Sequence, residues 1–403
     1  MLPLTSLATT ALLAAAVAIG PLATDMYLPA LTELGASFAA GQDRVQLTLS
    51  IYLAGFALAQ LFCGALSDRF GRKPILIGGL LLFALASFGC AMAQSMEQLI
   101  LWRFLQAVGG SVGPVLGRAA VRDIYPPEQA GRAMAILVSI MAMAPAIAPT
   151  LGGLLLLGFG WPAIFVALGG YALLLALVIA VKLPEPMPAA YRQSLRPVRL
   201  VVNYSRILKS RVFLGYTLIG GLLYASLFSF LSGSAFVLIE FLGVSPQAFG
   251  FWFAAVVVGY LVGSTSAVRL ANRLCSDRIL QLGITTAVTG GVMMTGLAVA
   301  EVFTVTAVII PQMVVMAGVG MSFPQTMAGA LMPFPSTAGT ASALLGFMQM
   351  TIAALVGMLV GQLHTGTSLV MALVIAASSL VAGLCYRFIV YPVRPATVVA
   401  STT

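Results

Sequence analysis

The chain has 403 residues, of which 60% are hydrophobic and only 8% charged, and its formal net charge is +9. Soluble domains carry roughly 25% charged residues, so this composition excludes a soluble globular protein, and unbroken apolar runs exclude the ~10-residue alternation of a β-barrel. The positive charge lies mainly in loops, as shown below, and does not indicate a nucleic-acid partner.

Long apolar runs recur along the whole chain, each near the ~20 residues that a helix needs to cross hydrocarbon. They predict an all-α membrane protein with about twelve transmembrane helices. The only long polar segment, 183–211, is rich in proline and basic residues and separates two groups of six. We therefore expect an N-terminal six-helix bundle over residues 1–182, a cytoplasmic linker over 183–211 and a C-terminal six-helix bundle over 212–403. The expected spans are 7–30, 45–66, 74–94, 98–121, 131–157, 161–182, 212–238, 247–268, 279–299, 302–324, 338–362 and 367–390.

The first apolar run has one alternative interpretation, a cleavable signal peptide over residues 1–20. No Lys or Arg precedes the run, and the run continues beyond any cleavage site, so we interpret it as the first span. It contains Asp25, in "AIGPLATDMYLPAL". Ten of the eleven acidic residues fall in loops or at helix ends, and Asp25 alone lies inside a span. Because a charge in hydrocarbon costs at least ~2.5–3.5 kcal/mol, Asp25 is expected to face an internal cavity or a partner.

The loop after the second span reads "GALSDRFGRKP", Gly64 to Pro74. Its glycines permit a tight turn. Asp68, at the end of one helix, and Arg72 and Lys73, at the start of the next, are expected to form a charged latch, with Asp123 as a further member. The alternative is ordinary positive loop charge. The second-half counterpart, "ANRLCSDR", contains Asn272 and Arg273 but has lost most of this pattern, so the latch is expected in one half only.

The fourth span, "LWRFLQAVGGSVGPVLGRAA", contains Arg103. Asp25 and Arg103 each lie five residues inside the outer end of their predicted spans, which is about 7–8 Å at 1.5 Å per residue. This matched depth predicts that the two charges meet across the bundle. The alternative for Arg103 is a side chain that reaches the outer headgroups. Gly109, Gly113 and Gly117 form a small-residue face that lets another helix approach.

Prolines at three positions of the fourth and fifth spans, Pro114, Pro145 and Pro149, are expected to break or bend those helices locally.

Basic residues give the orientation, because cationic loops stay cytoplasmic. With the N-terminus inside, seventeen of the twenty Lys and Arg residues fall in inner loops or the C-terminal tail. Both termini are therefore expected in the cytoplasm. The four cysteines have no metal-binding spacing, and His364 is the single histidine, so no metal and no cofactor are expected. The spans lack the clustered His, Cys and acidic residues of an enzyme and the continuous polar stripe of a channel.

These motifs carry a resemblance to a known family. "GALSDRFGRKP" resembles the motif between the second and third helices of major facilitator superfamily transporters. "RFLQAVG" resembles their fourth-helix motif, Arg-x-x-Gln-Gly-x-Gly, with Ala107 in place of the first glycine. "APAIAPTLGG" resembles the fifth-helix antiporter motif, although Ala144 and Ala148 stand where glycine is usual. "DMYLPAL", "VRDIYP", "FSFLSGSAFVLIE" and "AGTASALLGFMQ" are more narrowly similar to the bicyclomycin/chloramphenicol-resistance (Bcr/CflA) exporters.

The resemblance implies the major facilitator fold and a proton-coupled exporter of small amphiphilic drugs in the bacterial inner membrane. Helices 1, 4, 7 and 10 line the central cavity in that fold, so the resemblance places Asp25 and Arg103 there. Our hypothesis is that Asp25 carries the proton and that Arg103 is coupled to it. Burial disfavours a charged carboxyl group, whereas a nearby arginine favours it. The implied cytoplasmic gating motif is Gly64, Asp68, Arg69, Gly71, Arg72, Lys73 and Asp123. The implied antiporter motif is Pro145, Pro149, Gly152 and Gly153.

Five aromatic residues are candidates for lining the drug cavity, with lipid contact or core packing as the alternative for each: Tyr27, Tyr52, Phe56, Tyr224 and Phe228. With a single acid in the membrane, the expected cargo is a neutral or weakly charged amphiphile. The expected partners are therefore the drug, protons and membrane lipid, and we expect a monomer. A proton-coupled transporter that takes up a small metabolite shares the same features and remains the alternative.

Overall fold

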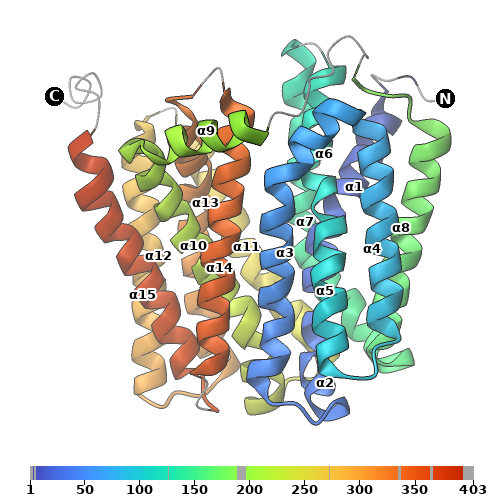
Figure 1. The fold of residues 1–403 in the computed structure, drawn as a ribbon. Coiled ribbons are helices and arrows are strands. Elements are labelled where there is room, and N and C mark those ends of the chain that lie inside the picture. The colour runs from blue at the N-terminus through green and yellow to red at the C-terminus, as the bar shows by residue number, and fades with distance from the viewer. Residues whose placement is uncertain are drawn as a thin grey trace. The chain divides into compact units, whose positions relative to one another are not determined.

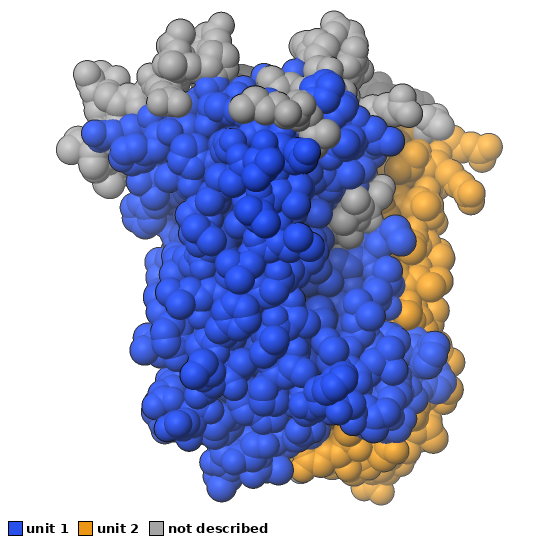
Figure 2. All heavy atoms as spheres, turned by 90° about the vertical axis from the view of Figure 1, so that its right-hand side faces the viewer, with its two compact units in different colours: residues 1–196, 244–253 blue, residues 197–243, 254–403 orange. Residues whose placement is uncertain are grey.

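The computed structural model describes residues 3, 6–125, 127–187, 197–271, 273–334, 337–363 and 366–393, and within this part the chain is helical without any β-strand. Two compact units divide it, one formed by residues 1–196 with 244–253 and the other by 197–243 with 254–403 (Figure 2). The boundary between them lies inside the predicted linker. The start of α11 (Pro246–Leu270) belongs to the first unit and the remainder of that helix to the second.

The first unit contains the helices that carry most of the candidate site. They are α1 (Leu7–Asp25), α2 (Leu31–Ser37), α3 (Gln42–Phe70), α4 (Arg72–Ala91), α5 (Met96–Gly110), α6 (Val112–Ile124), α7 (Pro127–Phe159) and α8 (Pro162–Lys182) (Figure 1). Within this unit α1 packs against α6, α7 and α8, while α5 packs against α3 and α4.

The second unit also consists mainly of long apolar helices. Its elements are α9 (Pro197–Leu208), α10 (Arg211–Ala235) with a π-helical turn (Phe236–Phe241), the rest of α11, α12 (Ser276–Val299), α13 (Val305–Leu331), α14 (Ala338–Gln362) and α15 (Leu369–Cys385) with a π-helical turn (Tyr386–Val390) and a final 3₁₀ turn (Tyr391–Val393). Here α10 packs against α13, α14 and α15, and α9 crosses the ends of α10 and α14 (Figure 1).

Eleven helices of the described residues are long and apolar enough to cross a membrane. The remaining predicted span, 131–157, corresponds to α7, whose described apolar part is Met143–Phe159. Large apolar side chains such as Leu85, Leu174 and Leu355 are more than 60% exposed, which is the surface that lipid covers in a helical membrane protein. The chain is therefore a multi-pass membrane protein, as its composition predicts.

Two boundaries differ from the prediction. The first span does not stop at Ala30, because a 3₁₀ turn at Leu28–Ala30 passes directly into α2 and extends the candidate span to Ser37. The fourth span consists of two helices, because the α-helix is interrupted at Ser111, between α5 and α6. Pro114 explains that break, because it has no N–H to offer the carbonyl four residues earlier. In contrast, α7 continues through Pro145 and Pro149 without interruption, so the expected break there is wrong.

Close helix contacts hold α1 in place. A Cβ atom on Gly113 of α6 would overlap the carbonyl oxygen of Ala16, and one on Gly152 of α7 would overlap that of Met26. Small residues permit such backbone approach in membrane bundles. Two neighbouring helices thus pack against the backbone of α1, the second of them one residue beyond Asp25.

Candidate functional site

Asp25 is the last residue of α1 and is only 3% exposed. Its Oδ1 atom accepts a hydrogen bond of 3.0 Å from the hydroxyl of Thr24. No cation of the described residues forms an ion pair with it. A buried carboxylate normally has a charged or well-bonded partner. In this position the carboxylate of Asp25 can be charged only if water, a cation or substrate stabilises it. Without such a partner the carboxyl group is expected to hold a proton.

Arg103 on α5 has no exposed surface at all. Its Nη1 atom donates to the carbonyl oxygen of Ala23 at 3.1 Å and to Oε1 of Gln106 at 2.7 Å. The Nε and Nη2 atoms have no hydrogen-bond partner among the described residues. The Gln106 amide continues the chain of bonds by donating to Ser87 at 2.8 Å. Arg103 is thus a buried cation with neutral oxygen acceptors.

Three aromatic rings surround the guanidinium of Arg103. Its central carbon lies 4.4 Å from the ring centroid of Tyr52, 4.5 Å from that of Tyr27 and 5.8 Å from that of Phe165 on α8. The negative faces of aromatic rings attract a cation, and more strongly where water is excluded. We call these three side chains the aromatic cage. Sequence reasoning missed Phe165. It lies in a uniformly apolar span, so nothing in the sequence distinguishes it from other phenylalanines of the core.

The predicted ion pair between Asp25 and Arg103 is not formed in this structure. The two helices do meet at the expected level, because Arg103 bonds to α1 at Ala23, two residues before Asp25. The guanidinium, however, is held by the aromatic cage and Gln106, and the carboxylate is bonded to Thr24. The guanidinium of Arg103 on α5 therefore bonds to α1 two residues before Asp25, without an ion pair between the two charged groups.

The other candidate aromatic residues lie in different surroundings. Phe56 is one turn from Tyr52, with ring centroids 6.2 Å apart, and packs near Gly20 of α1. In the second unit, Tyr224 is partly buried and its ring lies 6.1 Å from that of Phe323. Phe228 is buried and lies against Gly357 of α14, so its visible role is packing within its own unit.

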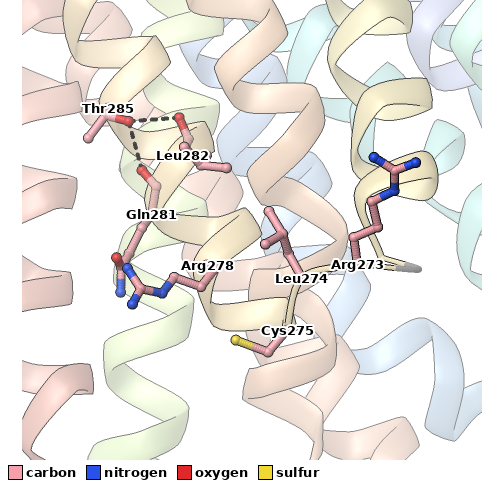
Figure 3. A pocket seen from close by; sticks show the side chains of 7 residues that line it. All are labelled: Arg273, Leu274, Cys275, Arg278, Gln281, Leu282 and Thr285. Atoms are coloured by element: carbon pink, nitrogen blue, oxygen red, sulfur yellow. Dashed lines mark hydrogen bonds between the residues drawn. The ribbon is translucent and has the colours of Figure 1, made fainter. Parts of the chain in front are cut away.

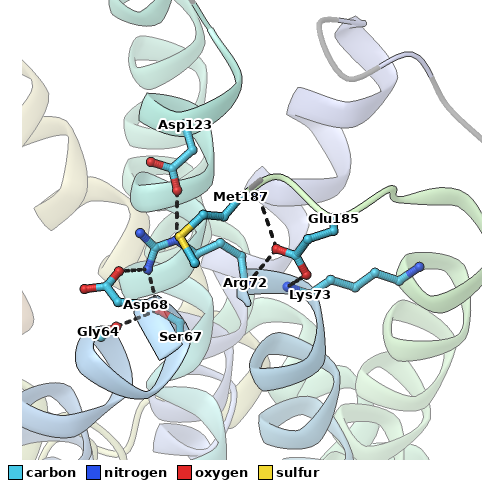
Figure 4. A network of polar contacts seen from close by, with 8 residues as sticks. All are labelled: Gly64, Ser67, Asp68, Arg72, Lys73, Asp123, Glu185 and Met187. Carbon is cyan, nitrogen blue, oxygen red and sulfur yellow. Dashed lines mark hydrogen bonds and ion pairs between the residues drawn. The ribbon is translucent and has the colours of Figure 1, made fainter. Parts of the chain in front are cut away.

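At the loop between α3 and α4, Arg72 contacts Asp68 and Asp123, whereas the charged group of Lys73, which was expected with them, lies elsewhere (Figure 4). We call the network around Arg72 the latch. Arg72 is buried, with Nη1 2.6 Å from Oδ1 of Asp68 and Nε 2.8 Å from Oδ2 of Asp123. It also donates to the Ser67 hydroxyl, which itself donates to the carbonyl of Gly64 at 2.7 Å. Two carboxylates and one hydroxyl thus engage a single guanidinium and tie the ends of α3 and α6 to the start of α4.

The backbone of this loop explains its glycine. Gly71 has φ of +103°, a conformation that residues with a side chain rarely adopt, and it ends α3 directly before α4 begins. Of the remaining motif residues, Lys73 donates from Nζ to the carbonyl of Ala180 on α8 at 2.8 Å. Arg69 is exposed and lies over the ring of Phe70, 5.2 Å from its centroid, so it takes no part in the latch.

Glu185 completes the latch and was missed by sequence reasoning. Its carboxylate accepts hydrogen bonds from the backbone N–H of Arg72 at 2.8 Å and of Lys73 at 3.2 Å (Figure 4). An acidic group at the first turn of a helix satisfies free N–H groups and interacts favourably with the helix dipole. Glu185 therefore ties the segment after α8 to the start of α4. The only sequence signal was an acid between two prolines, "PEP", at the start of the linker.

The fifth-helix motif makes close contacts on α7. Besides Gly152 at Met26, a Cβ atom on Gly153 would lie 2.6 Å from the carbonyl oxygen of Pro246, at the start of α11. Both contacts lie within the first unit. Pro145 and Pro149 are accommodated inside α7. Among the described residues, no three His, Cys, Asp or Glu side chains gather into a site for a metal ion.

A family model and several known proteins match most of the chain. The model of the Major Facilitator Superfamily covers residues 13–358. An uncharacterised transporter of this type from Bacillus subtilis strain 168, YdgK, is 33% identical over 377 residues, which are 91% of this chain and 92% of that protein. A chloramphenicol resistance protein of Pseudomonas aeruginosa is 34% identical over 298 residues, covering 72% of this chain and 68% of the relative.

The solved structures agree on the fold. The crystal structure of a D-xylose–proton symporter superposes with a TM-score of 0.75 over 95% of this chain and 98% of the symporter. Its sequence is only 15% identical, so this similarity concerns the arrangement of helices and not the cargo.

Proposed function

The chain belongs to the Major Facilitator Superfamily, and we propose that it exports small amphiphilic drugs from the bacterial cytoplasm in exchange for protons. The proposal includes the inner membrane as its location, with both termini in the cytoplasm. The chloramphenicol resistance relative supports a drug as cargo. The superfamily consists of transporters that expose a site to the two sides of a membrane in turn, which leaves the driving ion and the cargo to be argued from the residues.

The observation that carries the proposal is the environment of Asp25. It is buried at the end of α1 with no cation paired to it among the described residues, and its carboxylate accepts a hydrogen bond from Thr24. Acidic groups inside membrane segments are characteristic of proton and ion pathways. A carboxyl group in this position can remain neutral when sealed off and ionise when water or cargo reaches it. Asp25 is therefore our proton carrier.

Arg103 is proposed to couple that proton to the movement of α1. Its bond to Ala23 links the buried guanidinium directly to the helix that ends at Asp25. A shift of α1 that breaks this bond changes the distance between a fixed positive charge and the carboxyl group, and hence the preference of Asp25 for its proton. The Nε and Nη2 atoms of Arg103, which have no hydrogen-bond partner among the described residues, are available to donate to a relocated carboxylate.

The latch around Arg72 is proposed to control the conformational cycle and not the choice of drug. It joins α3, α4 and α6 at the loop between α3 and α4. None of its residues is close in sequence to Asp25, which ends α1. A buried arginine with two carboxylates is held strongly, so opening this network is a discrete step. Asp68→Asn is expected to slow transport while leaving the relative rates for different drugs unchanged.

Transport in inside-out membrane vesicles tests the proposal. Acidifying the vesicle interior should drive chloramphenicol or another weakly charged amphiphile into vesicles that contain the wild-type chain. Asp25→Asn should abolish this pH-driven uptake, whereas Asp43→Asn, which alters an exposed acid on α3, should retain it. Full uptake by Asp25→Asn would refute the role of Asp25. Movement of the cargo out of the vesicles, down the proton gradient, would favour the alternative of metabolite uptake.

A further inference from the structure

A pocket of about 760 Å³ lies where the chain enters α12, in the second unit (Figure 3). Seven residues from the end of the loop and the first turns of the helix line it: Arg273, Leu274, Cys275, Arg278, Gln281, Leu282 and Thr285. None of them belongs to the proton site or to the latch. The segment is the second-half counterpart of the charged loop, and its retained arginines have no role in the proposed function.

The pocket is positively charged. Arg273 and Arg278 are exposed, and neither forms an ion pair within the part of the chain that the structure describes. In Figure 3 their side chains lie on opposite sides of Leu274 and Cys275. The acid in the same turn, Asp277, accepts a hydrogen bond of 2.7 Å from the hydroxyl of Tyr386 and one of 3.1 Å from the amide of Gln281. This turn therefore carries two exposed cations and one carboxylate, and that carboxylate accepts hydrogen bonds from two neutral groups.

The pocket continues onto a helix face suited to hydrocarbon. Leu282 is 43% exposed, and Val292 and Val299 further along α12 are 52% and 65% exposed. The exposed Thr285 hydroxyl donates to the carbonyl oxygens of Gln281 and Leu282 at 3.0 and 2.9 Å, so it offers no free donor to lipid. A polar group inside a bilayer must be satisfied in this way. The pocket thus joins a cationic end to an apolar helix face.

We propose that this pocket binds the phosphate headgroup of an anionic phospholipid, whose acyl chains lie along the exposed face of α12. Basic pockets at helix ends recognise such headgroups. A free phosphate accounts for the two arginines but not for the apolar face that leads away from them. The two guanidinium groups supply the donors around the phosphate, because the amide of Gln281 already donates to Asp277 and to the hydroxyl of Tyr386. The inference concerns a lipid partner and stands independently of which cargo the chain transports.

The test measures lipid binding to the full-length chain purified in detergent. Phosphatidylglycerol is titrated and the bound lipid counted by native mass spectrometry. Replacing both arginines, Arg273→Gln with Arg278→Gln, is expected to weaken binding about thirtyfold, because each basic residue near an anionic headgroup contributes on the order of a tenfold or smaller factor. Arg206→Gln, which removes an exposed charge on α9 of the same unit, should leave the affinity unchanged. Phosphatidylcholine should show no dependence on the arginine pair.

The outcomes separate the alternatives. If the double variant retains a cooperative thermal transition and binds phosphatidylglycerol as tightly as the wild type, the site is refuted. If glycerol phosphate at millimolar concentration competes with the bound lipid as effectively as added phosphatidylglycerol does, the pocket recognises the phosphate group alone. The lipid assignment is then wrong. Should the double variant fail to fold, the lysine pair, Arg273→Lys with Arg278→Lys, and the single Arg278→Gln decide: the first should bind within a few-fold of wild type and the second several-fold more weakly.

Discussion

Arg103 and Arg72 lie in the same unit, and both are buried, but their charges are balanced in opposite ways. Arg72 has two carboxylates and a hydroxyl within bonding distance. Arg103 has two ring faces within 4.5 Å, a backbone carbonyl and an amide oxygen, and no carboxylate. Arg72 thus forms ion pairs with two carboxylates, whereas Arg103 forms no ion pair with the nearby Asp25.

This difference matches two mechanical tasks. A network in which carboxylates neutralise the arginine holds helices together and opens as a unit, which suits a latch. A cation satisfied by neutral groups leaves the nearby Asp25 free of a permanent counter-charge, so that its protonation can change with access to water. An Asp25–Arg103 ion pair as close as the one between Asp68 and Arg72 would hold the carboxylate charged and oppose proton uptake. In the proposed mechanism, the separation of the two groups is what leaves Asp25 able to take up a proton.

The same substitution at both arginines provides the sharpest test of the comparison and the largest expected effect. Arg103→Lys loses the planar group between the rings of Tyr27 and Tyr52, and cation–π contacts away from water are worth up to about 2 kcal/mol. We expect the initial rate of pH-driven transport to fall about tenfold or more. Arg72→Lys keeps a point charge between Asp68 and Asp123, so its rate should fall only a few-fold.

Initial rates in inside-out vesicles, normalised to the amount of folded protein, give the ratio of the two losses. Equal losses would mean that the aromatic cage contributes no more than an ordinary ion pair and would remove the basis of the comparison.

The next effect concerns the packing that positions Asp25. Gly152→Ala places a methyl group on the carbonyl oxygen of Met26, where there is no space for it. Overpacking of this kind costs about 1–3 kcal/mol, and here the strain falls on the residue after Asp25. We expect a lower thermal midpoint and a transport rate reduced about tenfold. Gly158→Ala on the same helix has no atom within 4 Å of the added methyl and is the matched control, because both changes favour the helix equally. Equal damage from both would show that contact with Met26 is not responsible.

A smaller effect is expected for the carboxylates of the latch. The side chain of Asp123 is 19% exposed and that of Asp68 is 42% exposed, so Asp123→Asn should slow turnover more than Asp68→Asn, and both by a few-fold. Since both bond the same guanidinium, the double variant should lose less than the product of the two single losses. Transport of several drugs by each variant provides the measurement. A changed drug preference with normal turnover would contradict the role of a latch.

The smallest effect is expected at Glu185. Glu185→Gln removes the charge and keeps one of the two oxygen acceptors, so it can accept from the N–H group of Arg72 or of Lys73. A charge at a helix N-terminus contributes about 0.3–1 kcal/mol. We expect a slightly lower thermal midpoint and a change in transport rate below about twofold. Glu97→Gln, in the exposed pair with Arg44, should have no measurable effect. A loss as large as that of Asp123→Asn would place Glu185 among the principal groups of the latch.

Much of the fold and part of the site follow from the sequence. Hydrophobic length predicts the spans, and the resemblance to the major facilitator superfamily and its resistance exporters is confirmed by the relatives. The contact of Arg72 with Asp68 was predictable, because a short loop restricts where its charges can lie. Asp123 was a predictable further partner, because it lies at the end of a predicted span on the same side of the membrane. The partners of Arg103 were not, because distance along a helix gives depth in the membrane but not which way a side chain points around the axis. Glu185 was missed because it comes from a segment 113 residues away from Arg72.

The proton balance of the purified chain is the most direct test that Asp25 exchanges a proton during transport. In weakly buffered detergent solution, addition of the drug transported in vesicles should release protons from the wild-type chain as drug and proton compete. Asp25→Asn that still binds the drug should release none. Equal proton release from the wild type and from Asp25→Asn would show that another group carries the proton and would contradict the proposed mechanism.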